Sequence, residues 1–257
     1  MTKNLRISVS QVKTYMKSPA EWAWQKILWI YTKLVNSSIT SWSAFHKVRE
    51  TNNKADWMLI IHQADESIKE EAIEKFNNLE DNYERLCRLV DVPTSIKNEE
   101  EFNVDIFDNW IFWKGYIDWQ TEDAVIEYKS SSSLSEQDSN VAMRQAENNW
   151  DQYEFQAWIY MRATGKKKCY IIEVLNKDTT ITEKTRIKKD DLISLCENFQ
   201  EGDEKLTMAK IVAKYEPRKN PWQVITFTMD KKFDKRMTDK YMPIINEMKD
   251  LFNKHSK

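Results

Sequence analysis

The stretch of sequence that decides the fold is GYIDWQTEDAVIEYK, residues 115–129. Two runs of β-branched and aromatic residues flank a polar turn at 120–123, which predicts a pair of antiparallel strands. Because side chains alternate along a strand, a turn with an even number of residues places Asp118 on the same face as Glu127 and Lys129. An odd number would scatter the three side chains.

Two carboxylates and one ammonium group on one face can hold a hard divalent cation and an attacking water beside a phosphate. The more common role of such residues is a cross-strand ion pair on an exposed sheet. Two features favour a site: the second strand begins with a core-like apolar pair, and Gly115 precedes Asp118 where a close backbone approach is expected. The turn would pair Trp119 with Ala124.

The rest of the chain alternates between helical and extended patterns, with no internal repeat and no linker rich in Pro, Gly or Ser. Helices are expected from Ser8, at 18–31, from Ser37 or Ser38, and at 56–90, 141–164, 190–214 and 230–253; strands are expected at 102–107, 110–119, 124–129, 169–175, 180–188 and 224–228. Capping-box spacings start the first two helices, and Gly165 ends the long helix. The order of helix, three strands, helix and strand predicts a mixed α/β core.

Composition excludes several classes of protein. Only three of the 257 residues are glycines, too few for the glycine-rich phosphate loops of nucleotide-binding folds. The net charge of −2 divides into −9 for residues 1–160 and +7 for residues 161–257, an asymmetry that can mark a nucleic-acid surface but more often reflects solvated helices. Short apolar runs, no leader-like N-terminus and three scattered cysteines predict a cytoplasmic protein without a membrane segment.

Five short motifs occur in a recognisable order. They are Ile7-Ser8-Val9-Ser10-Gln11-Val12 with Ser18-Pro19, Phe45-His46-Lys47-Val48-Arg49-Glu50, Gly115-Tyr116-Ile117-Asp118, Ile126-Glu127-Tyr128-Lys129-Ser130-Ser131, and Gln156-Ala157-Trp158-Ile159-Tyr160. This order resembles the PD-(D/E)XK nuclease superfamily, and within it the RecB-like exonuclease branch, which includes CRISPR-adaptation nucleases and phage recombination exonucleases. The resemblance covers about residues 7–190.

The resemblance implies an α/β fold with a restriction-endonuclease-like core: a helix, a three-stranded antiparallel meander, a helix and a strand, with helical additions at both ends. It implies a single nuclease-like domain over residues 1–257. The expected parts are a core at about 37–50 and 101–190, a helical insertion at about 51–98 and a C-terminal helical extension at about 190–257.

The resemblance also implies a metal site, in which His46, Asp118 and Glu127 ligate Mg²⁺ or Mn²⁺. Trp42 departs from the family, which often has glycine four residues before the histidine, so this helix is expected to lie further from the sheet. Ser18 stands where iron–sulfur members have a cysteine, and we therefore expect no iron–sulfur cluster.

The remaining motif residues acquire roles in the same way. Lys129 would orient the water and offset negative charge, while Gln156 and Tyr160 would position Lys129 or the nucleic acid strand. Without the resemblance, Gln152, Gln156 and Tyr160 are simply a polar stripe at i, i+4 spacing on the helix, equally compatible with solvent-facing positions.

The leading hypothesis is a metal-dependent deoxyribonuclease, specifically an exonuclease in recombination, repair or phage DNA processing, with DNA as its substrate and a recombination or single-strand-annealing protein as a candidate partner. The alternatives are a catalytically inactive nucleic-acid-binding module of the same fold and a restriction-type endonuclease.

Two further groups of residues bear on nucleic-acid binding. Lysine-rich clusters at 166–168, 188–189, 218–219 and 231–232 could contact phosphates if a nuclease site exists. The tryptophans Trp22, Trp24 and Trp29 could stack on bases, but a role in helix packing is the stronger expectation.

Overall fold

The computed structural model describes residues 5–30, 35–51, 53, 55–89, 97–131, 141–177 and 222–255. The elements in these ranges are β1 (Leu5–Ile7), α1 (Val9–Lys17), α2 (Pro19–Lys26), α3 (Ser37–Thr51), α4 (Asp56–His62), α5 (Glu66–Leu89), β2 (Lys97–Val104), β3 (Ile111–Gln120), β4 (Ala124–Ser131), α6 (Val141–Thr164), β5 (Lys168–Leu175), β6 (Trp222–Thr228) and α9 (Lys231–His255). The strand expected at 180–188 and the helix expected at 190–214 lie outside the described residues.

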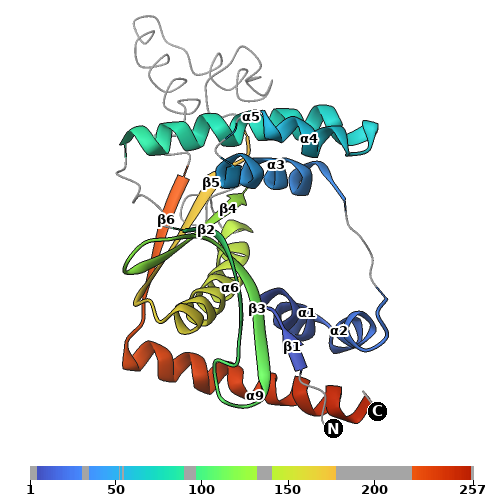
Figure 1. Ribbon diagram of the computed structural model, residues 1–257, viewed down its shortest axis with the longest axis vertical. Coiled ribbons are helices and arrows are strands. Elements are labelled where there is room, and N and C mark those ends of the chain that lie inside the picture. Colours follow the sequence, from blue (N-terminus) through green and yellow to red (C-terminus); the bar gives the residue numbers. More distant parts are fainter. Residues whose placement is uncertain are drawn as a thin grey trace, which may run out of the picture.

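A six-stranded mixed sheet forms the centre, in the order β1-β3-β4-β5-β6, with β2 paired to β3 (Figure 1). The strands β2, β3 and β4 form the expected antiparallel meander. The strand β5 runs parallel to β4, which is possible because the long helix α6 provides the crossover. The strand expected at 224–228 is β6, and it pairs antiparallel with β5.

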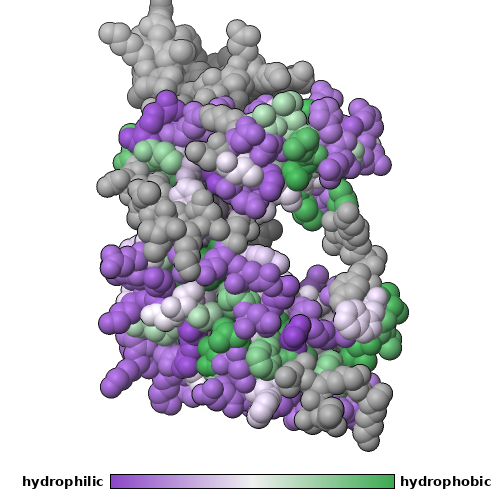
Figure 2. Space-filling model, in the orientation of Figure 1, coloured by the Kyte–Doolittle hydropathy of each residue, from purple (hydrophilic) through white to green (hydrophobic). Residues whose placement is uncertain are grey.

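Two apolar clusters cover the two faces of this sheet. One packs α1, α2, α6 and α9 against β1, β3, β5 and β6, with Trp22, Trp113 and Trp158 fully buried. The other packs α3, α4 and α5 against β4 and β5 around Phe45 and Tyr128. The helices are therefore sorted into two layers, and Figure 2 shows the molecule hollowed between α3 and α4 on one side and α1 and α2 on the other.

The first two helices begin as the sequence predicts. The hydroxyl of Ser8 accepts from the amide of Gln11, whose side chain accepts from the amide of Ser8, which completes the capping box of α1. The hydroxyl of Ser18 caps α2, with Pro19 at its first position. Because Ser8 lies between β1 and α1, this capping box sets the point at which the chain turns from the strand into the helix.

Two expected helices are shorter than predicted. The helix expected at 56–90 is interrupted between α4 and α5, because the carboxylate of Asp65 accepts from the amide of Ser67 and caps a new helix start. The helix expected to reach residue 31 ends at Lys26, and Trp29 adopts a left-handed backbone with φ of 58°.

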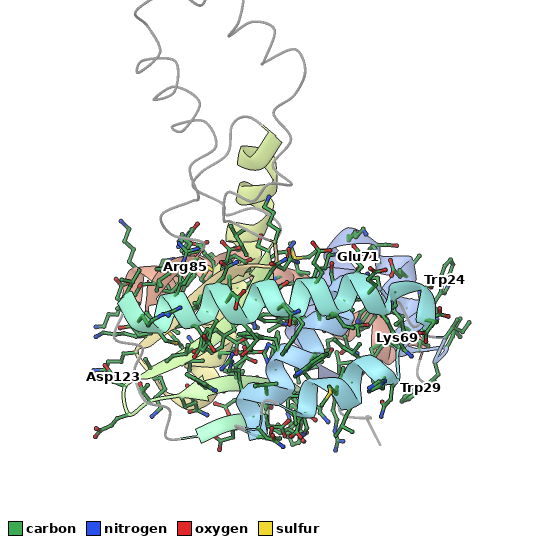
Figure 3. All side chains as sticks on the ribbon, turned by 90° about the horizontal axis from the view of Figure 1, so that it is seen from above. Trp24, Trp29, Lys69, Glu71, Arg85 and Asp123 are labelled. Carbon is green, nitrogen blue, oxygen red and sulfur yellow. The ribbon has the colours of Figure 1, made fainter. Side chains whose placement is uncertain are left out.

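The expected packing role holds for Trp22 but is wrong for Trp24 and Trp29. Trp22 is fully buried, whereas 56% of Trp24 and 76% of Trp29 are exposed. Figure 3 shows both exposed tryptophans at the outer end of the molecule. Two helix positions correspond to about 200°, so Trp24 faces away from the core that holds Trp22.

The pairing of β3 and β4 differs from the expected pairing by two residues. Trp119 pairs with Ile126 instead of Ala124, and the amide of Thr121 donates to the carbonyl of Ala124 at 2.9 Å. The hydroxyl of Thr121 also accepts from the amide of Ala124 at 3.1 Å, so the turn closes more tightly than four residues require. The turn still contains an even number of residues, which places Asp118 level with Glu127.

Candidate active site

The centre of the site is a fork between β3 and β4. Beyond the paired residues next to the turn, two carboxylates take the place of backbone partners. The amide of Asp118 donates to Oε1 of Glu127 at 3.3 Å, and the amide of Tyr128 donates to Oδ2 of Asp118 at 2.8 Å. Asp118 and Glu127 are thus held against each other by the backbone of the opposite strand.

Two further side chains converge on Glu127. Its Oε2 accepts from Nζ of Lys129 at 3.1 Å and from Nε2 of Gln156 at 2.6 Å. Glu127 is only 2% exposed, and burial together with the negative charge of Asp118 raises its pKa to about 8. The structure therefore brings Asp118, Glu127, Lys129 and Gln156 into one contiguous polar cluster.

Lys129 remains charged in this cluster. Burial by itself would lower its pKa, but Glu127 and Asp118 outweigh burial, and the pKa is raised. Its side chain is 26% exposed and faces solvent on one side. An ammonium group that contacts both a buried carboxylate and solvent can interact with an incoming anion.

Tyr160 lies next to this cluster, on the same cleft wall as Gln156. Burial and the charge of Glu127 raise the pKa of Tyr160 well above its ordinary value, so its hydroxyl stays protonated. Its ring packs edge-on against Phe102, with 5.3 Å between ring centroids. A Cβ at Gly115 would lie 2.7 Å from the Phe102 ring and 3.4 Å from the Tyr160 ring, so glycine is required for this close approach.

His46 approaches the cluster from the other face of the sheet. Its Nδ1 lies 3.5 Å from Oδ1 of Asp118, and its ring packs edge-on against Trp42 at 4.5 Å between centroids. The indole of Trp42 lies beside the imidazole and does not keep His46 from reaching Asp118.

The donor set is chemically suited to a divalent cation. Two carboxylates and an imidazole are ligands that Mg²⁺ and Mn²⁺ accept, and a cation would offset the burial and the repulsion by Asp118 that raise the pKa of Glu127. In the part of the chain that the structure describes, no group of three His, Cys, Asp or Glu side chains is gathered closely enough to enclose a metal ion. The three residues fit the chemistry of a metal site, although they do not form a closed set of ligands.

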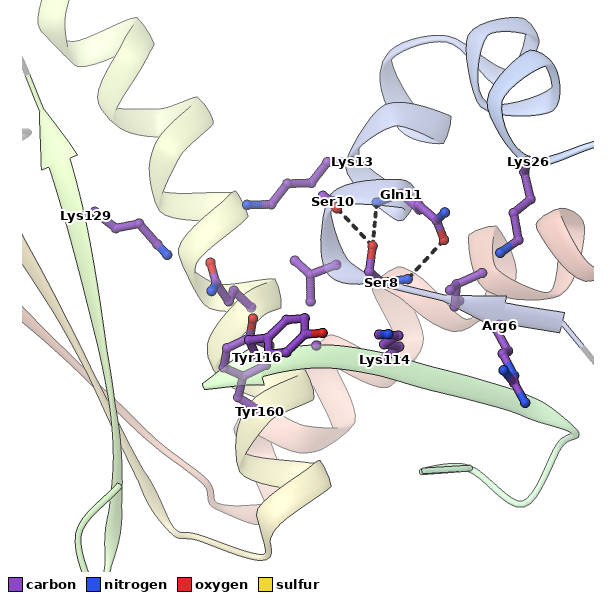
Figure 4. A pocket seen from close by; sticks show the side chains of 14 residues that line it. Arg6, Ser8, Ser10, Gln11, Lys13, Lys26, Lys114, Tyr116, Lys129 and Tyr160 are labelled. Atoms are coloured by element: carbon purple, nitrogen blue, oxygen red, sulfur yellow. Dashed lines mark hydrogen bonds between the residues drawn. The ribbon is translucent and has the colours of Figure 1, made fainter. Parts of the chain in front are cut away.

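A cleft of about 580 Å³ opens beside the cluster, on the α6 side of the sheet (Figure 4). Lys129, Gln156 and Tyr160 form one part of its wall. No carboxylate occurs among the described residues that line this cleft. Five of the lining side chains are cationic: Arg6, Lys13, Lys26, Lys114 and Lys129. The cleft is thus a concave surface suited to a polyanion.

These cations are not the ones that the sequence suggested. Lys166 donates to the carbonyl of Glu122, Lys168 pairs with Asp123, and the 231–232 pair begins α9, so none of these lines the cleft. The clusters at 188–189 and 218–219 lie outside the described residues. All five cleft cations come from residues 1–160, the part of the chain with negative net charge, and folding collects them from different elements.

Sequence reasoning missed four of the five cleft cations as site residues: Arg6, Lys13, Lys26 and Lys114. Each is a single cation among apolar and polar neighbours, and no local cluster marks it. One signal was available for Lys13: it follows the Ser8-to-Val12 motif by one residue on the same predicted helix.

No helix within the described ranges is long and apolar enough to cross a membrane.

Comparison with known protein families gives no match, and comparison with curated proteins gives none either. Solved structures do show similarity. A candidate exonuclease from Eubacterium rectale has a TM-score of 0.58 and 11% identity, over 96% of this chain and 82% of that chain.

Two further structures match with lower TM-scores. A phage-related exonuclease from Haemophilus somnus 129PT gives a TM-score of 0.42 at 15% identity, over 98% of this chain and 97% of that one. LHK-Exo in complex with dAMP gives 0.28 at 10% identity, over 82% and 91%. On the first comparison, the chain has the mixed α/β fold of that Eubacterium rectale protein, in agreement with the PD-(D/E)XK exonuclease-type fold that its motifs predict.

Proposed function

We propose that the protein is a divalent-metal-dependent nuclease that hydrolyses phosphodiester bonds in DNA. The observation that carries this proposal is the cluster of Asp118, Glu127, Lys129 and Gln156 beside a cleft lined by cations. Paired carboxylates suit a metal and an attacking water, whereas the cleft suits a phosphate backbone. The fold shared with a candidate exonuclease supports this function.

Asp118 and Glu127 would hold the cation, with His46 as a third ligand from α3. A Mg²⁺ or Mn²⁺ ion bound there would lower the pKa of its bound water and neutralise negative charge on the phosphate. No iron–sulfur cluster enters this proposal.

The side chains around the carboxylates have distinct tasks. Gln156 fixes the orientation of Glu127 by donating to Oε2. Lys129 presents its ammonium group to the charge that develops on the phosphate in the transition state. Tyr160 remains protonated and lies beside Gln156 on the cleft wall, so it positions the site and does not act as a base.

The test is hydrolysis of linear and covalently closed DNA, each single- and double-stranded, with Mg²⁺, with Mn²⁺ and with EDTA. We expect linear DNA to be degraded only with a divalent cation, and Glu127→Ala and Lys129→Ala to abolish degradation. Full activity of either purified variant would contradict the assigned roles. An exonuclease needs an end, so cleavage of closed circles at defined sites would instead indicate a restriction-type endonuclease.

One observation favours a second candidate, a nucleic-acid-binding module without catalysis. The Oε2 atom of Glu127 is already occupied by Lys129 and Gln156, and no closed three-ligand group is present among the described residues. Calorimetry distinguishes the two: Mn²⁺ binding that is lost in Asp118→Asn supports the nuclease. DNA retention in a gel without any metal binding supports the module. In either case a recombination or annealing protein is the proposed partner, testable by co-purification.

A further inference from the structure

The cations of the cleft differ in how their charge is balanced. Lys114 pairs with Glu101 at 2.8 Å, and Lys129 pairs with Glu127 at 3.1 Å. Lys13, on α1, forms no ion pair within 4 Å with any residue in the described ranges. It is half-buried nonetheless, so its charge is held in the cleft wall without a carboxylate partner.

Lys13 and Lys129 extend toward the same part of the cleft from opposite walls. Figure 4 shows their ammonium groups facing each other, one from α1 and one from β4, while Arg6 and Lys26 lie at the other end. Burial, together with the positive charge of Lys129, lowers the pKa of Lys13 to about 8. The fold thus holds two like charges close together at the side of the cleft nearest the carboxylates.

Such an arrangement is unfavourable for the protein alone. Desolvation and repulsion by Lys129 both disfavour the charged form of Lys13, and the negative charge of Glu127 offsets them only in part, since the pKa of Lys13 remains lowered. An anion placed between the two ammonium groups would attract both and so offset desolvation and repulsion, and a phosphate group has enough oxygen atoms to accept from both lysines.

We infer that Lys13 and Lys129 bind one phosphate group of the nucleic acid strand between them, and that Lys13 is a substrate-binding residue of this site. The inference rests on the nucleic-acid function proposed above and adds to it a residue that lies outside the carboxylate and lysine motifs. Lys129 then interacts with the phosphate on one side and with Glu127 on the other, whereas Lys13 interacts with the phosphate alone.

The two lysines should therefore differ in what they control. Loss of Lys13 weakens ground-state binding of the strand and leaves Glu127 with both of its partners, Lys129 and Gln156. Loss of Lys129 changes the surroundings of the carboxylate as well. Lys13→Gln should accordingly raise KM more than it lowers kcat.

The experiment measures binding of a short fluorescent single-stranded oligodeoxynucleotide to the full chain in EDTA, as a function of salt. We expect Lys13→Gln to weaken binding about tenfold at low salt and to reduce the salt slope by about 0.7, the amount for one phosphate contact on a single strand. Lys13→Arg should keep most of the affinity. Lys232→Gln, which removes the same charge from the exposed start of α9, should change neither quantity.

Thermal unfolding adds a readout that a purely structural role would not give. Because Lys13→Gln removes a repelled charge, its melting temperature in phosphate-free buffer should be equal to or higher than that of the wild type. Lys13→Met serves as a second variant if the first folds poorly.

The outcomes separate this inference from the proposed function. Unchanged oligonucleotide affinity and salt slope in Lys13→Gln overturn the inference, even if the wild type degrades DNA. Weakened binding in Lys13→Gln supports the inference, even if the wild type hydrolyses nothing with Mn²⁺, in which case only the nuclease proposal fails. A wild type that does not bind the oligonucleotide contradicts both.

Discussion

The two sides of helix α6 treat charge in opposite ways. One side carries Gln156 and Tyr160 at i, i+4 spacing and faces the cluster on β4. The other carries Glu154, Trp158 and Arg162 at the same spacing and faces α9. Two residues along a helix correspond to about 200°, so the two stripes lie back to back.

On the α9 side both charged residues of the stripe, Glu154 and Arg162, have an opposite partner. Arg236 donates to both oxygens of Glu154 at 3.0 and 2.7 Å, and Arg162 donates to both oxygens of Asp234 at 2.8 and 2.5 Å. The indole of Trp158 also donates to Asp234. Paired charges with bidentate geometry serve to dock one helix on another.

On the β4 side like charges are gathered. Asp118 touches Glu127, and Lys13 faces Lys129, so both signs are concentrated without being fully balanced. Such a surface costs stability unless something binds there. Unbalanced charge, rather than charge itself, therefore distinguishes the candidate site from a structural interface on this helix.

The largest expected effect comes from changing the β4 side. If the proposed mechanism holds, Glu127→Gln and Lys129→Met should lower the rate of DNA hydrolysis about 100- to 1,000-fold, because each removes a group to which that mechanism assigns a role in the transition state. The melting temperature of Glu127→Gln should not fall much, since it relieves the crowding of two carboxylates, whereas Lys129→Met removes the ammonium partner of Glu127 and should melt at a lower temperature. Lys232→Gln is the control. A hydrolysis rate within tenfold of the wild-type rate in either variant would contradict the assignment of the catalytic site to the β4 side of α6.

The pH dependence of stability should differ between the two sides of α6. The pKa of Glu127 is raised from 4.5 to about 8, so the folded state binds the extra proton and is favoured at low pH. In EDTA, the free energy of unfolding should fall as the pH rises from about 5 to 8, by on the order of a few kcal/mol.

Asp234 should give the opposite slope. Burial by itself would raise its pKa, but the hydrogen bonds from Arg162 and Trp158 outweigh burial, and the pKa lies below 3.8. Its contribution is present above that pH and is lost as the pH falls through the folded-state pKa. Urea unfolding of the wild type, Glu127→Gln and Asp234→Asn measures both slopes; a wild-type slope retained in Glu127→Gln would refute the first assignment.

A smaller effect is expected from the α9 side. Arg236→Met leaves the buried carboxylate of Glu154 without this partner and should lower the free energy of unfolding by about 1–3 kcal/mol. The hydrolysis rate per folded molecule should stay near that of the wild type. The neighbouring Lys235→Met breaks only the exposed pair with Asp239 and should have no measurable effect on stability. A large rate loss in Arg236→Met would show that the two sides are not separable.

The smallest effect concerns the contact between the sheet and the α6 stripe. Gly115→Ala brings a Cβ against Phe102 and Tyr160, and should cost about 1 kcal/mol and lower the hydrolysis rate severalfold. Adding Phe102→Leu should restore the rate. Gly165→Ala, at φ of 73° with open space around it, should destabilise by a similar amount through backbone strain but leave the rate unchanged.

Some elements of the fold follow from local sequence signals. The boundaries of α6, β3, β4 and β5 agree closely with the expected ranges because each element has strong periodicity or a clear stop signal, whereas β2 (Lys97–Val104) begins and ends earlier than the strand expected at 102–107. The break before Asp65 was missed because a helix cap within a charged run has no distinct pattern. The stripe of Glu154 and Arg162 was also missed, since its partners lie more than 70 residues away.

By itself, the sequence determined which chemistry-bearing residues exist and that Asp118 shares a strand face with Glu127, because an even turn fixes the parity of side chains in a hairpin. Only the tertiary structure decided that β3 and β4 fork so that each carboxylate binds the other strand's backbone. It also decided that Lys13 faces Lys129 and that His46 reaches Asp118 across the sheet. Those contacts depend on the packing of α1, α3 and α6 against the sheet, and no local pattern encodes the position of one element on another.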